Sequence, residues 1–515
     1  MATDTSVSVV QRELQRRGWV RLIIAGVLLA IFLVGLLAIV FGGVAYYRFT
    51  RSGTPYQASE VDHFKYGSIG SEATSGLPYW VWQTLPALFP EVFKGGDYSV
   101  FGFLYETDAQ GNKRDLPIGL SRREVHGVEL VWLNCAVCHT GSVRTSAEAT
   151  HRIIPAMPSN NLDLHRFVKF ILGIADDPRL EPDNLIPAVE KTGARLDWLD
   201  RLSWRYIVIP QVRQGLLERR VRLDRLLALQ PSWGPGRVDT FNPYKLIQFQ
   251  IPFATLTEQE RIGTADFPSI FNQGPREGMH LHWDGNNTSL AERNLSAALG
   301  AGVTVQSVDH AGINRVAHWL LDLHPPPSPY HPDTTKIGAG RAIYMTQCAG
   351  CHGYQDNNSY VFKGDRVGQV EANAMLGADV WRLDSYTQRL RDMQLTLFSG
   401  TPYQFTHFTK TNGYANLPLD GLWLRAPYLH NGSVPTLADL LLPPEQRPKA
   451  FVRGIDVLDP EKGGFQAPPC APGQPIATGF CFDTGQPGNG NGGHLYGINL
   501  TPSDRSALLA YLLTF

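Results

Sequence analysis

Two copies of the pattern C-x-x-C-H constrain this chain more than any other feature of its sequence. They occupy residues 135–139 and 348–352, and they use four of the six cysteines among 515 residues. In this pattern two thiols attach covalently to a c-type haem and the adjacent histidine binds its iron. The chain is therefore predicted to carry two covalent haem c groups. The predicted attachment and ligand residues are Cys135, Cys138 and His139 for one group and Cys348, Cys351 and His352 for the other.

Zinc ribbons and thioredoxin-like redox pairs also contain C-x-x-C and are the alternatives to haem. Neither of them explains a histidine directly after each cysteine pair. Each haem iron also has a position opposite its motif histidine, which is either open or filled by another histidine or a methionine. His494 is a candidate because it lies in a Gly-rich loop just before the last predicted helix, whereas Met375 and Met393 look like apolar helix positions.

Residues 22–45 contain no charged side chain and are long enough for a helix that crosses a bilayer. More arginines precede this run than follow it, which by the positive-inside rule places the N-terminus in the cytoplasm. We expect a cytoplasmic segment at 1–19, a single-pass anchor in a bacterial inner membrane at 20–47, and a periplasmic body in contact with membrane lipid only through this helix. A cleaved signal peptide is the alternative, although its apolar region is usually shorter. The arginines are Arg12, Arg16, Arg17 and Arg21 before the run and Arg48 and Arg51 after it.

The composition limits the class of protein. Lys plus Arg number 46 and Asp plus Glu number 47, a balance that argues against nucleic-acid binding. Apolar residues make up 43% of the chain, enough for a large core, and the length suggests more than one domain. Cys470 and Cys481 flank a loop rich in Pro and Gly, so a disulfide is expected there in an oxidising compartment, with two free thiols as the alternative.

A proline-rich segment at 325–332 cannot be helical and marks the expected domain boundary. We place the first haem domain at 48–323, the linker at 324–335 and the second haem domain at 336–515. The expected fold class is mainly α, with two cytochrome c-type haem domains, long irregular loops and one N-terminal transmembrane helix.

Helical periodicity appears at 162–174 and at 196–227, where Pro210 predicts a break or kink. A further helix is predicted at 337–347, running directly into the second haem motif. Thr501 followed by proline predicts the start of a closing helix. A helix before C-x-x-C-H and a helix at the end of the chain are what a cytochrome c domain needs to enclose its haem.

Several longer stretches, with the paired haem motifs, resemble the bacterial di-haem cytochrome c peroxidase superfamily. LRAPYLHNGS (424–433), FPSIFNQ (267–273) and HWDGNN (282–287) carry this resemblance. WGPGRVDTFNPYK (233–245), GLPYWVW (76–82) and the GGHLYG segment are similar to the rubber oxygenase-like branch of that superfamily. The likeness extends over most of the chain after the apolar run.

The resemblance implies roles for single residues. Trp283 matches the tryptophan that relays electrons between the haems. His494 matches the distal ligand of the C-terminal haem, which makes that haem an electron-transferring one and leaves the haem of His139 to react with peroxide or dioxygen. Arg237 is a candidate partner of a haem propionate, because a guanidinium fork suits a carboxylate, with a structural arginine as the alternative. Some relatives hold calcium between the domains, so calcium is a candidate cofactor.

The chain departs from the rubber oxygenases at the reactive haem. Those enzymes place a phenylalanine downstream of the bridging tryptophan, and here residues 296–300 read SAALG. His282 directly precedes Trp283 and, like His280, is a candidate proton donor or iron ligand in that pocket. A membrane-tethered enzyme is also poorly placed to attack an extracellular polymer, so rubber cleavage is not expected.

We therefore expect a peroxidase- or oxygenase-like oxidoreductase that exchanges electrons with a periplasmic donor or acceptor. Its expected catalytic residues are His139, His282 and Trp283. The alternative is a non-catalytic di-haem electron-transfer cytochrome of a periplasmic or membrane redox chain, in which both irons are six-coordinate. A maturation or assembly factor is a third reading.

Overall fold

The computed structural model describes residues 4–108, 110–356 and 359–515, with side chains described from Val9 onward. The first three residues of the predicted cytoplasmic segment lie outside this range. The contacts divide the chain into two units. The first is Met1–Gly53 with Glu124–Glu129, and the second is Thr54–Arg123 with Leu130–Phe515.

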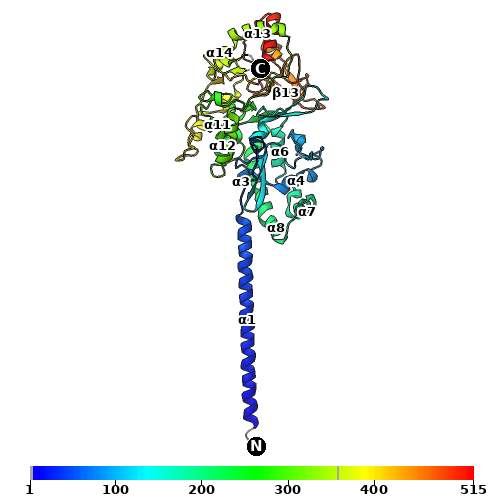
Figure 1. Cartoon of the computed structure of the whole chain (residues 1–515), viewed down its shortest axis with the longest axis vertical. Helices are drawn as coiled ribbons and strands as arrows, with labels where there is room; N and C mark the ends of the chain where they lie inside the picture. The colour runs from blue at the N-terminus through cyan, green and yellow to red at the C-terminus, as the bar shows by residue number, and fades with distance from the viewer. Residues whose placement is uncertain (1–3, 109, 357–358) are drawn as a thin grey trace. The chain divides into compact units, whose positions relative to one another are not determined.

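Helix α1 (Asp4–Thr50) makes up most of the first unit and is drawn as one uninterrupted helix in Figure 1. Over Val9–Thr50 it is long and apolar enough to cross a membrane. It begins well before the predicted residue 20, because most residues just before the apolar run are strong helix formers. Glu13 and Arg17 also pair one turn apart, with 3.6 Å between Oε1 and Nη2. The predicted apolar helix is confirmed, while its orientation and the compartment stay predictions.

The second unit mixes helices with small antiparallel sheets joined by long loops, so it is less purely helical than predicted. The helices before the proline-rich segment are α2 (Glu60–Tyr66), α3 (Glu72–Ser75), α4 (Tyr79–Leu88), α5 (Cys135–Cys138), α6 (Leu164–Gly173), α7 (Pro182–Thr192), α8 (Trp198–Ser203), α9 (Ile209–Leu229), α10 (Asn242–Ile247), α11 (Leu290–Gly300) and α12 (His310–Leu321). The strands there are β1 (Leu77–Pro78), β2 (Leu120–Val125), β3 (Val128–Leu133), β4 (Thr140–Val143), β5 (Arg152–Pro155), β6 (Arg237–Asp239) and β7 (Thr264–Asp266), of which β2 and β3 belong in part to the first unit.

The remainder of this unit has the same character. Its helices are α13 (Thr334–Gln347), α14 (Ala349–His352), α15 (Asn373–Leu376), α16 (Trp381–Ser385), α17 (Gln388–Gln394), α18 (Leu437–Leu440) and α19 (Pro502–Leu512). Its strands are β8 (Tyr354–Asp356), β9 (Ser359–Val361), β10 (Val370–Ala372), β11 (Gly413–Ala415), β12 (Ala450–Arg453) and β13 (Phe480–Asp483).

The strands form small antiparallel sheets that hold the loops around the two motifs. Strand β4 begins directly after His139 and pairs with β5 in the register Thr140↔Pro155. Strands β6 and β7 pair through Arg237↔Asp266, and β10 and β11 pair through Val370↔Ala415. Sequence-distant segments are thus held against one another by backbone hydrogen bonds.

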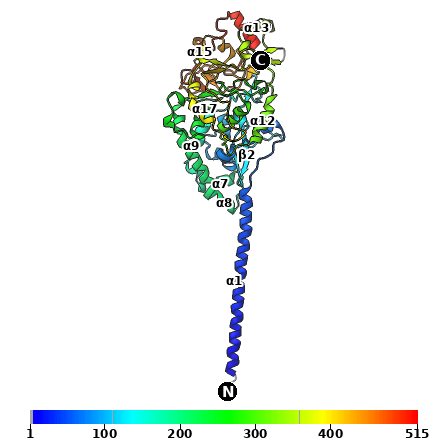
Figure 2. The same ribbon diagram turned by 90° about the vertical axis from the view of Figure 1, so that its left-hand side faces the viewer.

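The predicted helix at 162–174 is confirmed as α6, and the run at 196–227 is helical but is not broken at Pro210. A π-helical turn at Trp204–Val208 joins α8 to α9, and Pro210 stands at the start of α9. Proline has no N–H to donate, and the wider turn just before it, closed by the Ile209 N–H on the Trp204 carbonyl, lets the helix continue past Pro210. Figure 2 shows α7, α8 and α9 along one side of this unit.

Helices α13 and α19, which flank the second motif, confirm two predictions. Thr501 caps α19 by accepting a hydrogen bond from the Asp504 N–H at 3.1 Å. The two helices cross closely at Gly340, where a Cβ atom would lie 1.9 Å from the Ala507 carbonyl oxygen. Only glycine permits that approach, so the crossing of these helices is fixed by one residue.

The proline-rich segment contains no helix, as predicted, and packs onto the following part of the chain. The Tyr330 hydroxyl donates to the Gly464 carbonyl at 2.9 Å, and Ser328 Oγ donates to the Leu513 carbonyl at 2.6 Å. Residues on both sides of the segment also belong to one compact unit and share a hydrophobic core. The division into two haem domains at 324–335 therefore stays a prediction.

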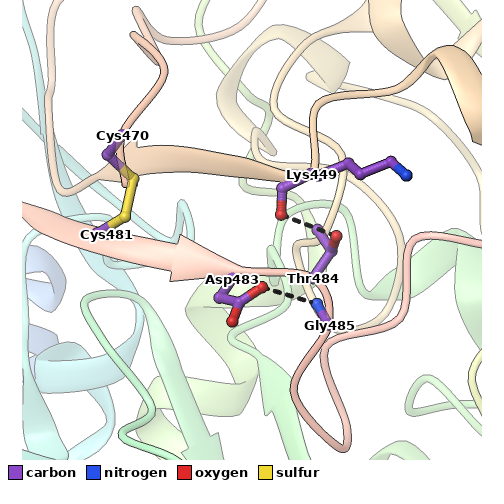
Figure 3. The surroundings of a disulfide bond; sticks show 6 residues. All are labelled: Lys449, Cys470, Cys481, Asp483, Thr484 and Gly485. Atoms are coloured by element: carbon purple, nitrogen blue, oxygen red, sulfur yellow. Dashed lines mark hydrogen bonds between the residues drawn. A yellow bond between two sulfur atoms is a disulfide. The ribbon is translucent and has the colours of Figure 1, made fainter. Parts of the chain in front are cut away.

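The predicted disulfide between Cys470 and Cys481 is present, with 5.9 Å between the two Cα atoms. It closes the loop that leads into β13, the strand paired with β12 (Figure 3). Just beyond, the Thr484 hydroxyl donates to the Lys449 carbonyl at 2.9 Å. The disulfide thus ties the loop to a strand edge that is already held by hydrogen bonds.

Candidate haem-binding sites

The first motif folds as the single helical turn α5. Asn134 caps this turn, because its side-chain oxygen accepts a hydrogen bond from the Ala136 N–H at 3.0 Å. Gly119 packs against it with φ +90°, and a Cβ there would lie 2.4 Å from the Val137 nitrogen. The turn presents Cys135 and Cys138 as half-buried free thiols, one turn apart on the same helical segment.

His139 follows this turn and is oriented by one backbone hydrogen bond. Its Nδ1 donates to the Pro268 carbonyl at 2.9 Å, which leaves the Nε2 lone pair available. Burial, helped by the nearby Arg293, lowers the pKa of His139 to about 4. The neutral imidazole is the form that binds a metal, and the Nδ1 hydrogen bond fixes its tautomer.

The second motif repeats this arrangement. Helix α13 ends at Gln347, Cys348 follows it, and α14 carries the turn to His352. His352 Nδ1 donates to the Leu417 carbonyl at 2.8 Å, again leaving Nε2 available, and burial lowers the pKa of this imidazole. Both motif histidines are therefore neutral, oriented and ready to bind through the same nitrogen.

His494 faces His352 across a gap of defined width. The two ring centroids are 6.2 Å apart and the planes are tilted by 41°. An imidazole nitrogen lies about 2 Å from a metal it binds and its ring centre about 1.1 Å farther, so two rings opposed across one ion have centres about 6.2 Å apart. Burial, followed by the effect of His352, lowers the pKa of His494 to about 3. The separation of the two rings and the burial of His494 therefore suit a pair of imidazoles that would hold one iron.

The loop that carries His494 is fixed in an unusual conformation. His494 has φ +52° and follows Gly493 at φ +80°, a backbone that costs energy for a residue other than glycine. Arg447 is 2% exposed, and its guanidinium donates to the carbonyls of Asn491, Gly493 and His494 at 2.7, 2.9 and 3.3 Å. His494 Nδ1 is buried and has no hydrogen-bond partner among the described residues. The strained loop is thus held so that the imidazole meets His352.

Trp283 lies in a loop that is hydrogen-bonded to one segment before the proline-rich linker and to one after it. Its indole N–H donates to the Asp266 carbonyl at 2.8 Å, and its own carbonyl accepts from the Ala415 N–H at 2.8 Å. The neighbouring Asp284 forms a buried ion pair with Arg382, with 2.8 Å between Oδ1 and Nη2. The indole is therefore rigidly placed, while its position between two haems stays a prediction.

His282, next to Trp283, is also strained and neutral. It has φ +66°, and its Nδ1 lies 2.6 Å from the side-chain oxygen of Asn286, so Nδ1 is the donor and Nε2 carries the lone pair. Burial lowers its pKa to about 4. His280 makes a similar bond, with its Nδ1 2.7 Å from the Gly285 carbonyl oxygen. Both histidines can accept a proton or a metal only through Nε2.

Arg237 is 1% exposed, yet no ion pair to it appears within the described residues. Its guanidinium donates to the Asn489 side-chain oxygen at 2.8 Å and to the Gly488 carbonyl at 3.1 Å, and its Nε is buried without a partner. Burial, followed by the nearby Arg453, lowers its pKa to about 9. These hydrogen bonds show that Arg237 has a structural role. A buried cation with an unused donor also suits an anionic group, and binding of a haem propionate stays a prediction.

Sequence reasoning missed Arg293, on α11. It lies close enough to Cys135, His139 and His282 to affect the pKa of each, and burial lowers its own pKa to about 10. Its guanidinium forms no hydrogen bond or ion pair within the described part of the chain, although its backbone N–H donates to the Ser289 carbonyl at 3.0 Å. Sequence reasoning also missed Arg447. The sequence alone does not distinguish a buried arginine on a helix or in a loop from one that is exposed to solvent.

The alternatives to haem fit the cysteines poorly. Burial raises the pKa of Cys135 to about 11 and of Cys138 and Cys348 to about 12, whereas redox-active thiols have lowered pKa values. In the described residues no group of three or more His, Cys, Asp or Glu side chains is placed to hold a metal ion. Calcium stays a prediction.

Comparison with known proteins relates the second site to a known family. Residues 413–452 match a family described as RoxA-like, cytochrome c-like. This stretch contains the Leu417 carbonyl that orients His352, the Ala415 N–H bonded to Trp283, and Arg447, which holds the His494 loop. The match relates the chain to rubber oxygenase-like cytochromes and supports c-type haem.

Two proteins of Sinorhizobium fredii are similar to this chain. The uncharacterized protein y4iM is 31% identical over 248 residues, which are 45% of this chain and 53% of that protein. The uncharacterized protein y4iJ is 43% identical over 110 residues, which are 20% of this chain and 17% of that protein. The chain thus spans about half the length of the first relative and less of the second.

Proposed function

We propose that this chain is a membrane-anchored, periplasmic di-haem c-type cytochrome that acts as a peroxidase- or oxygenase-like oxidoreductase. One haem is attached at Cys135 and Cys138 and the other at Cys348 and Cys351. Such a group, when bound, supplies iron that changes oxidation state and, where a position is open, takes up peroxide or dioxygen. The apolar helix α1 and the arginines before it support the anchoring.

The observation that carries this proposal is the difference between the two sites. His352 faces the imidazole of His494 at 6.2 Å, whereas no ring contact to His139 occurs among the described residues. An iron held by two histidines would suit electron transfer, whereas an iron held by one histidine would leave room for a small oxidant. The His139 site is therefore the reactive one.

The residues around His139 fit that role. Arg293 brings an unpaired positive charge near His139 and His282. His282 donates through Nδ1 to Asn286 and keeps Nε2 as an acceptor, so it can take a proton from a bound oxidant and return it. Trp283, fixed by its hydrogen bond to Asp266, is proposed to carry electrons between the sites.

Spectroscopy of the purified full chain tests this function. We expect two haem equivalents in the pyridine haemochrome assay, with one low-spin and one high-spin iron in the EPR spectrum. His494→Ala should convert the low-spin signal to high-spin, and His139→Ala should abolish turnover of peroxide while both haems stay attached. A spectrum unchanged by His494→Ala would remove that residue as a ligand and with it the division of roles.

One observation favours the electron-transfer alternative. His282 is buried, neutral and held in a strained conformation near the charge that also affects His139, so its Nε2 is a candidate ligand of the first iron. If it binds, both irons are six-coordinate and the chain is a carrier. Two low-spin signals in the resting protein, one of which becomes high-spin in His282→Ala, would decide for the carrier.

A further inference from the structure

We propose that an exposed apolar face on α8 and the π-helical turn after it contacts the surface of the bilayer that α1 crosses. We call this face the interfacial patch and define it as Trp198, Leu202, Tyr206 and Ile207. The proposal goes beyond redox activity and depends on one part of the proposed function, the membrane anchoring.

The side chains of the patch are apolar or aromatic and strongly exposed. The four side chains are 61%, 47%, 70% and 52% exposed, in chain order. Trp198, Leu202 and Tyr206 are spaced by four residues, which places them on one face of the helical run. Folded proteins seldom leave such a cluster in water unless it meets a partner or a membrane.

The patch is held in place by the rest of its unit. The opposite side of the same run is buried, since Trp204, Val208 and Ile209 are 7%, 8% and 1% exposed. Two ion pairs connect the run to α7. They join Arg201 Nε to Glu190 Oε1 at 2.7 Å and Arg205 Nη2 to Asp183 Oδ1 at 2.5 Å. The helical run that carries these side chains is therefore held against α7, and Figure 2 shows α8 beside α7.

The charges around the patch balance, which favours a lipid surface over a charged protein partner. An apolar face with tryptophan and tyrosine suits the boundary between headgroups and acyl chains, where these amphipathic rings collect. Residues 182–207 contain four basic and four acidic side chains. The basic ones are Lys191, Arg195, Arg201 and Arg205, and the acidic ones are Asp183, Glu190, Asp197 and Asp200.

The chain length between the span and the second unit keeps a bilayer within reach. Helix α1 ends at Thr50 and α2 begins at Glu60. The nine residues between them reach at most about 32 Å when fully extended, so the second unit stays close to any bilayer that α1 crosses. The tether therefore keeps the patch near the bilayer around α1, which raises the effective concentration of lipid at the patch.

Photolabelling of the full chain tests the proposal. The haem-loaded protein is placed in nanodiscs whose phospholipid carries a diazirine in the acyl chain, illuminated, digested and analysed by mass spectrometry. We expect label on α1 and on residues 196–208. The variant Trp198→Gln/Tyr206→Gln should reduce label on 196–208 about fivefold and leave α1 unchanged. Because the patch is neutral, higher salt should not reduce the label.

A matched control lies on the same helical run. Val221, on α9, is 80% exposed outside the patch, and Val221→Gln should change label at neither place. Label on α1 but not on 196–208 overturns the proposal and leaves the anchoring intact. Absence of label from both overturns the anchoring and with it the proposal. Loss of a dimer by light scattering in the double variant, with 196–208 unlabelled, assigns the patch to a second copy instead.

Discussion

A buried ion pair beneath the Trp283 loop allows a quantitative test of how this unit is held together. Arg453 Nη2 lies 2.7 Å from Asp266 Oδ1, and the two side chains are 2% and 7% exposed. Arg453 also donates to the Gly432 carbonyl at 2.9 Å. The pair joins β7 to β12, on opposite sides of the proline-rich segment. Its removal therefore tests the coupling of the two parts of the chain.

We expect Arg453→Met to lower the free energy of unfolding by about 3 kcal/mol. Breaking a buried pair by removing one partner costs about 3–5 kcal/mol, because the other charge stays buried. The loss of the bond to Gly432 adds about 1 kcal/mol. The nearby Arg237 offsets part of this cost, because its repulsion with Arg453 disappears and it remains to stabilise Asp266.

Guanidinium unfolding of the oxidised full chain in detergent measures this value. The double variant Arg453→Met/Asp266→Asn should lose less than the sum of the single variants, by about 1–3 kcal/mol, because each single change strands the same partner. The matched control is Arg220→Met, which breaks the exposed pair with Asp176 and should leave the midpoint unchanged. A loss below about 1 kcal/mol, or strict additivity, would refute the reasoning.

Three further predictions use other parts of the fold. Cys470→Ser/Cys481→Ser should destabilise the chain by about 3 kcal/mol in denaturant unfolding, because the disulfide closes a loop of 11 residues, and prior reduction of the wild type should abolish the difference. Asp456 is partly desolvated, but hydrogen bonds from Ser142 and Arg144 hold its pKa below the usual value, so its contribution to stability is present above about pH 4 and disappears as the pH falls through the lower folded pKa. Asp456→Asn should flatten that acid limb in a pH series of melting temperatures, and an identical limb would contradict the assignment. Gly340→Val should lower the melting temperature and the haem content, because its Cβ would collide with the Ala507 carbonyl, whereas Gly338→Ala, with open space around it, should not.

The local chemistry of the motifs could be predicted from the sequence, and the supporting contacts could not. C-x-x-C-H specifies its own geometry within one turn, and a Gly-rich loop before a closing helix indicated His494. The acceptors of the motif histidines are backbone carbonyls of Pro268 and Leu417, which any residue type could provide. No pattern in the sequence marks such an acceptor.

The organisation of the chain shows the same limit. A proline-rich segment predicts a stretch without helix, which the structure has, but its rigidity does not imply a boundary. Tyr330 and Ser328 bond to residues far along the chain, and Asp266 bonds to Arg453 across the segment. Pro210 likewise predicts a break, yet a π-helical turn accommodates it. Packing between distant segments decides these cases, and periodicity does not report it.

The equivalent hydrogen bonds of His139 and His352 have an electronic consequence. Each ring donates its Nδ1–H in a hydrogen bond to a neutral peptide oxygen. A carboxylate acceptor would instead push more electron density into the imidazole. Neither hydrogen bond therefore favours imidazolate character in its ring, so this contact would not distinguish the two histidines as ligands of an iron. If an iron were bound at each site, a gap between the two midpoint potentials would have to come from other features, such as burial, the charge of Arg293 near His139, or the group opposite each histidine.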